Sequence, residues 1–183
     1  MAITPDTKNW TWVLDQVCPE CGFDAAGVDL AAMGALVRAN VEAWPAQLAD
    51  PRARVRPSDD RWSALEYGCH VRDVFVLFDE RLRRMLTEDG PQFANWDQDV
   101  TAVEQRYDLQ DPREVTRELV AAGEACAARW DTVTDDDRGR TGDRSDGSSF
   151  TVDTFARYFL HDPVHHLVDV RTGYADLDRV TLA

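Results

Sequence analysis

Histidine is the residue type in this sequence that is best suited to bind a metal ion, and its four copies are clustered. His70 stands alone, whereas His161, His165 and His166 lie close together near the end of the chain. In an α-helix, positions i and i+4 are about 40° apart, so His161 and His165 would project from one face. His166 would point well away from His161 and is expected not to be a ligand; the alternative is that Pro163 rotates the helix and His166 replaces His165. The H-x-x-x-H spacing therefore predicts two imidazole ligands for one metal ion.

His70 is the third predicted ligand, because its predicted helical face also carries Glu66 and Val74 and should turn toward the interior. Three inward histidines from two helices would form a facial set with coordination positions open for water or substrate. The alternative is that these are hydrogen-bonded core histidines and a chance helical pair. Pro163 favours the metal, since a proline inside a helix costs about 3 kcal/mol and such kinks tend to lie beside functional sites.

Two carboxylates lie within about one helical turn of the histidines. Asp73 and Asp169 are candidate acceptors for imidazole N–H groups, which would orient the rings. Solvated or ion-paired carboxylates are the alternative.

The cysteines divide into two pairs. Cys69 and Cys126 lie in apolar helical patterns and are expected to be small buried residues. Cys18 and Cys21 form a C-x-x-C motif, which can chelate zinc or cycle as a dithiol. A structural zinc normally needs four ligands, and no second C-x-x-C or histidine pair lies nearby in the sequence. We therefore expect these two cysteines to be dispensable for the histidine site.

The elements that must position these residues are helices. Helical periodicity and end signals predict four long helices and a short helix within 96–107, and no segment alternates as a strand does. The long ranges are 29–44, 58–88, 111–130 and 151–173, with Gly173 as the last C-cap. Residues 134–149 read as a loop. Residues 1–28, with Trp10 and Trp12, are expected to form a non-helical arm that packs over the domain or lines a ligand pocket. The pattern predicts an all-α four-helix bundle.

The length and charge of the chain exclude several classes of protein. The 183 residues suit one domain, divided into the arm (1–28) and the bundle (29–183). A formal net charge of −14 disfavours binding to DNA or RNA. No apolar run approaches the roughly 20 residues that span a bilayer, and the N-terminus lacks the order of a secretory signal. We expect a cytoplasmic protein, a monomer or homodimer, with no nucleic-acid or membrane partner.

Two segments resemble a known family. The run from Trp62 to Asp73 is similar to the W-S-x-x-E-x-x-x-H-x-x-D signature of the DinB-like (DinB/YfiT) superfamily. The run from Tyr158 to Leu167 is similar to its closing H-x-x-x-H. The resemblance spans about residues 29–172. It implies an up-down-down-up bundle in which His70, His161 and His165 hold one divalent ion, with zinc as first choice and nickel, cobalt or iron as alternatives.

The same superfamily includes mycothiol-dependent isomerases, thiol S-transferases and metal-dependent hydrolases, so three functions are expected. In the first, the metal activates a low-molecular-weight thiol such as mycothiol for transfer or isomerisation of a small molecule. In the second, it activates water for hydrolysis, with Glu66 as a catalytic base unless that carboxylate only braces its helix. In the third, the bundle is a non-catalytic, metal-dependent binding or stress-response module.

Overall fold

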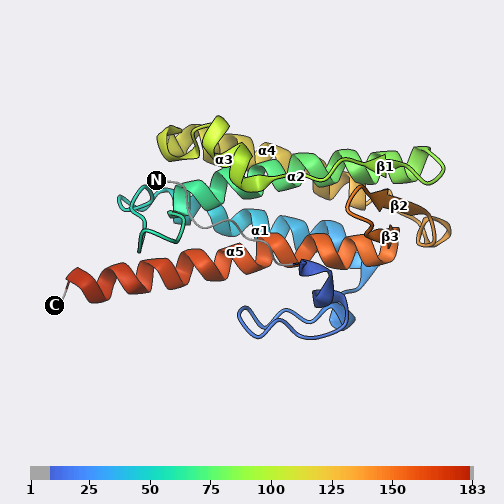
Figure 1. The fold of residues 1–183 in the computed structure, drawn as a ribbon, viewed down its shortest axis with the longest axis horizontal. Coiled ribbons are helices and arrows are strands. Elements are labelled where there is room, and N and C mark those ends of the chain that lie inside the picture. Colours follow the sequence, from blue (N-terminus) through green and yellow to red (C-terminus); the bar gives the residue numbers. More distant parts are fainter. Residues whose placement is uncertain (1–8, 182–183) are drawn as a thin grey trace.

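The computed structural model describes residues 9–181, which form a bundle of four long helices (Figure 1). They are α1 (Met33–Leu48), α2 (Ala64–Thr87), α4 (Pro112–Trp130) and α5 (Val152–Thr181). α1 and α5 run in one direction and α2 and α4 in the other, so the topology is up-down-down-up (Figure 1). The predicted fold class is confirmed.

Local signals explain where two of these helices begin. Ser63 caps α2, and Glu66 returns a hydrogen bond to the backbone of Ser63, which completes a capping box. Asp111 caps α4 and is followed by Pro112, whose missing N–H costs nothing at the first position of a helix. α4 packs against both α1 and α2, and α5 covers the same two helices from the other side. Cys69 and Cys126 are fully buried in the resulting core, as predicted.

The limits of three helices differ from the sequence prediction. α2 begins at Ala64 and not near residue 58. α1 continues through Pro45 to Leu48 instead of ending at Trp44, and Asp29 caps a separate 3-10 turn, η3 (Leu30–Ala32). α5 likewise continues through Gly173, which is therefore not a C-cap. A Cβ at Gly173 would lie 3.4 Å from Pro57, an ordinary van der Waals distance, so packing does not require glycine at this position.

A small sheet replaces the loop predicted for residues 134–149. In it β2 (Thr141–Arg144) pairs in parallel with β1 (Gln92–Phe93) and antiparallel with β3 (Ser149–Thr151). The prediction of no strands was wrong here because the strands are too short to show alternation. The sheet closes one end of the bundle by burying Phe93 and Phe150. Before this segment, the short helix α3 (Gln98–Glu104) lies where one was predicted.

The N-terminal segment, residues 9–28, contains no α-helix and lies against α5 (Figure 1). It has two 3-10 turns, η1 (Trp10–Leu14) and η2 (Ala25–Gly27). Val13 and Cys18 are fully buried, which fixes this segment to the bundle. A search of the described helices finds none with the length and apolar character needed to cross a membrane.

Candidate metal centre

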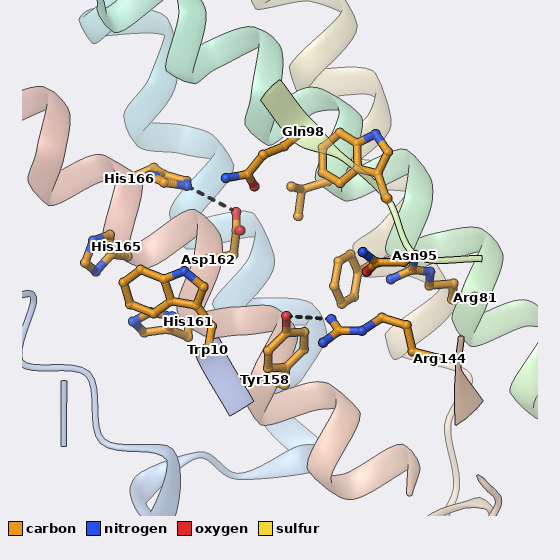
Figure 2. Close-up of a pocket in the computed structure, with 13 residues that line it drawn as sticks. Trp10, Arg81, Asn95, Gln98, Arg144, Tyr158, His161, Asp162, His165 and His166 are labelled. Atoms are coloured by element: carbon orange, nitrogen blue, oxygen red, sulfur yellow. Dashed lines mark hydrogen bonds and ion pairs between the residues drawn. The ribbon is translucent and has the colours of Figure 1, made fainter. Parts of the chain in front are cut away.

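The middle of α5 presents two sets of donor side chains on two neighbouring faces. His161 and His165 face the N-terminal segment, whereas Asp162 and His166 face α2 (Figure 2). Each pair is spaced by four residues, and the two pairs are offset by one residue. One residue is about 100° of helix rotation, so each pair joins a different cluster.

His70 of α2 joins the second pair, so that two imidazoles converge on the Asp162 carboxylate. Nε2 of His70 lies 3.3 Å from Oδ1 of Asp162, and Nε2 of His166 lies 3.8 Å from the same oxygen. These separations exceed the length of good hydrogen bonds, about 2.7–3.2 Å. They suit two ligands of one ion, because tetrahedral zinc with bonds of about 2.0–2.2 Å holds nitrogen and oxygen ligands about 3.4 Å apart.

Neighbouring residues orient both imidazoles. Nδ1 of His166 lies 2.9 Å from Oδ2 of Asp169, so a proton on Nδ1 would leave the lone pair of Nε2 toward Asp162. The ring of His70 is fully buried and stacks on Trp96 with 5.3 Å between centroids. Oδ1 of Asp162 is buried and has no hydrogen-bond partner among the residues described. These contacts leave Nε2 of both imidazoles close to the Asp162 carboxylate.

Charge also favours an ionised Asp162. Burial alone would raise its pKa, but His70 and His166 beside it hold the pKa of this carboxyl well below its usual range. The cluster therefore offers one carboxylate and two imidazoles, a donor set suited to zinc, iron, nickel or cobalt.

The first pair on α5 lies with the C-x-x-C motif. Cys18, Cys21, His161 and His165 each offer a ligand atom, and these atoms lie within 4.8 Å of one another. Burial, reinforced by the neighbouring His165, lowers the pKa of His161 to about 4. Burial also lowers the pKa of His165 and raises that of the Cys21 thiol to about 11.

The predicted ligand set of His70, His161 and His165 is thus divided between two clusters. Among the described residues, the groups of three or more close donor atoms place His70 with Asp162 and His166. The sequence prediction excluded His166 as a ligand and gave no role to Asp162, although these two residues share the i, i+4 spacing of His161 and His165. It also set aside Cys18 and Cys21 because their histidine partners are distant in the sequence.

A pocket opens beside these clusters, between α2, α5 and the segment that precedes α3. Its free space, including the open mouth, is about 700 Å³. Figure 2 shows Asp162 and His166 at one end of it, His161 and His165 beside Trp10, and Arg81 and Arg144 at the other end. The remaining wall is apolar or amide-bearing and consists of Val74, Phe78, Asn95, Trp96, Gln98 and Tyr158.

The arginine end of the pocket carries an excess of positive charge. Arg144 is paired with Asp146 and donates to the Tyr158 hydroxyl at 2.9 Å. Arg81 is 6% exposed and donates to the carbonyl of Ala94, and no carboxylate in the part of the chain described forms an ion pair with it. Burial, with Arg144 nearby, lowers the pKa of Arg81 to about 10, so it remains charged at neutral pH.

Glu66 and Asp73, two further candidates from the sequence, have other partners. Glu66 is buried in the capping box of α2 and forms an ion pair with Arg56. It is not among the described residues that line the pocket. Asp73 accepts hydrogen bonds from Arg72 and from the hydroxyl of Tyr107. Asp169, in contrast, contacts His166 as expected for an orienting acceptor.

Comparisons with known proteins agree with the fold. The family model of the DinB superfamily matches residues 35–169. The structure is similar to that of YfiT from Bacillus subtilis, which is described as a probable metal-dependent hydrolase with an unusual four-helix bundle topology. The two have a TM-score of 0.64 and 17% sequence identity, over 96% of this chain and 93% of that one. No curated protein matches the chain.

Proposed function

Because this chain belongs to the DinB superfamily, we propose that it is a metal-dependent enzyme whose divalent ion is held by His70, Asp162 and His166. The proposed substrate is a small molecule that carries a carboxylate or phosphate group. The proposed reaction is hydrolysis.

The observation that carries this proposal is the convergence of two imidazole Nε2 atoms on one carboxylate beside an open pocket. A divalent ion held by His70, Asp162 and His166 would supply Lewis acidity, which would make a water or thiol a better nucleophile at neutral pH. Two imidazoles and one carboxylate leave coordination positions for a nucleophile and a substrate atom. Asp169 would accept a hydrogen bond from Nδ1–H of His166, which would leave the lone pair of Nε2 free to bind the ion.

The far end of the pocket supports an anionic substrate. Arg81 lacks a carboxylate partner among the described residues, which is unusual for a buried arginine in a chain with a net charge of −14. A substrate carboxylate or phosphate would supply that partner through charge-assisted hydrogen bonds. Tyr158 and Arg144 lie beside the same position and would orient the group.

The thiol-dependent reaction expected from the sequence would use the same residues and differ only in the nucleophile. The description of YfiT as a probable metal-dependent hydrolase supports water, whereas the resemblance to mycothiol-dependent enzymes supports a thiol. We place hydrolysis first on the basis of the description of YfiT.

The test is a turnover screen of the metal-loaded protein with small esters, amides and lactones that carry a carboxylate or phosphate. Matched neutral compounds form the control set, and each compound is assayed with and without a low-molecular-weight thiol. We expect metal-dependent hydrolysis of the anionic compounds without added thiol. Turnover only with thiol would replace hydrolysis by thiol transfer, and no turnover in any arm would leave the third expectation, a binding module.

A further inference from the structure

The second cluster on α5 has the composition of a structural zinc site. We propose that Cys18, Cys21, His161 and His165 bind a zinc ion that fastens the N-terminal segment to α5. This site is distinct from the one formed by His70, Asp162 and His166.

The geometry of the cluster fits four zinc ligands. All four donor atoms lie within 4.8 Å of one another, and Sγ of Cys18 is 3.7 Å from Nδ1 of His165. Zinc bonds of about 2.3 Å to sulfur and about 2.0–2.1 Å to nitrogen place such a pair about 3.6 Å apart in a tetrahedron. Side-chain adjustments of a few tenths of an ångström in that pair would therefore suffice.

The spacing of the ligands also fits. Cys18 and Cys21 follow the C-x-x-C pattern and His161 and His165 the H-x-x-x-H pattern, which are the two halves of a Cys2His2 zinc site. A backbone hydrogen bond already folds the segment that contains Cys18 and Cys21. The N–H of Gly22 donates to the carbonyl of Cys18 at 2.8 Å, and Gly22 has a φ of 75°, which glycine adopts without strain.

Both histidines have ring atoms whose surroundings suit a metal. Nε2 of His161 is buried and has no hydrogen-bond partner in the described part of the chain, although the side chain is only 4% exposed. Such an atom is costly to leave unpaired, and coordination would satisfy it. Nε2 of His165 lies 3.5 Å from Glu20 and 3.6 Å from Asp169. The carboxylates therefore face one ring nitrogen, whereas Cys18 faces the other, Nδ1. This is the arrangement that orients zinc-bound imidazoles.

The charge of the loaded site suits its burial. Zinc binding releases the two thiol protons to solvent, and two thiolates with two neutral imidazoles then balance the charge of Zn²⁺. All four side chains are buried or half-buried, and neither cysteine forms a disulfide within the described residues. A neutral centre is cheaper to bury than an isolated charge.

The proposed zinc would also fix one wall of the pocket. Trp10 packs its ring against His161 and His165, with centroids 5.4 Å and 5.3 Å apart, and it lines the pocket next to Asp162. The ion would therefore hold the segment that carries Trp10 against α5 and leave the catalytic chemistry to the other cluster.

The experiment compares the zinc content of wild type with that of a Cys18→Ala/Cys21→Ala variant, purified without chelators. A Cys69→Ala/Cys126→Ala variant is the matched control, because those cysteines are buried away from the cluster. We expect the first variant to lose about one equivalent of zinc and the control to lose none. An Asp162→Asn variant should keep the thiolate-bound ion, which separates this proposal from the proposed enzyme function.

A second measurement holds even if the cysteine variant fails to fold. Cobalt substituted into the wild-type protein should show thiolate-to-cobalt charge transfer and the intense visible bands of a tetrahedral site. Hydrogen exchange of residues 9–28 should accelerate when zinc is removed. A cobalt spectrum without thiolate bands, or native protein that contains a Cys18–Cys21 disulfide in place of zinc, would overturn the proposal.

Discussion

Oδ2 of Asp169 lies 2.9 Å from Nδ1 of His166, one turn earlier on α5, while Nε2 of the same ring faces Asp162. The two contacts define which nitrogen of His166 can bind an ion. A carboxylate that accepts a hydrogen bond from Nδ1–H raises the basicity of Nε2 and holds the ring in place. The following predictions test this arrangement and the residues around it.

Replacing Asp169 with asparagine should weaken metal binding at His70, Asp162 and His166 by about 10- to 100-fold. The physical reason is that the amide orients the ring of His166 less firmly and does not raise its basicity. Competition with a chelator of known affinity measures the change. Asp176→Asn is the matched control, because Asp176 also lies on α5 but pairs with Arg61 and Arg179. Equal affinities in the two variants would remove Asp169 from the site.

Replacing Asp162 with asparagine should remove the ion from the proposed catalytic centre. The amide is a much poorer ligand than a carboxylate, so the rate should fall by more than the roughly 100-fold that loss of an orienting residue produces. Metal analysis and the turnover assay check this together. The ligand set predicted from the sequence, His70 with His161 and His165, makes the opposite prediction, since it does not involve Asp162.

Replacing Arg81 with methionine should raise the KM for anionic substrates by about 10- to 100-fold, the value of a lost hydrogen bond to a charged group. Methionine is a suitable replacement because the guanidinium lies over the rings of Phe78 and Phe93, and a methionine side chain can also pack against aromatic rings. The KM for neutral analogues should change little. Arg84→Met, on the same helix but paired with exposed Glu88, is the control. A uniform loss of activity on all substrates would argue against an anion subsite.

Replacing Glu66 with glutamine should lower stability at neutral pH by about 1–3 kcal/mol, because the buried ion pair with Arg56 becomes a neutral hydrogen bond. The turnover number should stay unchanged. Urea unfolding and steady-state kinetics measure the two effects. A large fall in turnover with unchanged metal content would restore Glu66 as a catalytic base.

The same pair should contribute a pH-dependent part of the stability. Burial alone would raise the pKa of Glu66, but Arg56 and Ser63 outweigh it, so the pKa in the folded protein lies below the ordinary value of 4.5. A lowered folded pKa means that the contribution is complete above 4.5 and disappears as the pH falls through the folded pKa. The difference in unfolding free energy between wild type and Glu66→Gln should therefore shrink in acid.

The sequence predicted the helices well because their end signals are local. Asp111 and Pro112 mark the start of α4, and apolar periodicity marks the faces that meet in the core. The faces of α5 were harder to assign, since the N-terminal segment covers one side of this helix and the bundle covers the other. Residues on both sides are buried or half-buried, so a helical-wheel projection could not distinguish His161 and His165 from Asp162 and His166.

The partnership between Cys18 and His165 was beyond sequence reasoning for a different reason. Their atoms are 3.7 Å apart only because the chain returns to its own beginning after four helices. Spacing rules describe ligands that are near in sequence. They could identify the C-x-x-C pair and the H-x-x-x-H pair separately, but they could not predict that the two pairs lie together in space.

The one-residue offset between the two donor pairs on α5 makes this helix intolerant of changes in length. Deleting one residue between Val152 and His161 would rotate everything after it by about 100°. Asp162 and His166 would then turn toward the N-terminal segment, and the positions beside His70 would receive Pro163 and Leu167, neither of which can bind an ion through its side chain. A point substitution would affect one cluster at a time, whereas a single deletion in this stretch would disable both clusters at once. Among natural homologues, length variation should therefore occur in the connections before α5 and not in its first three turns.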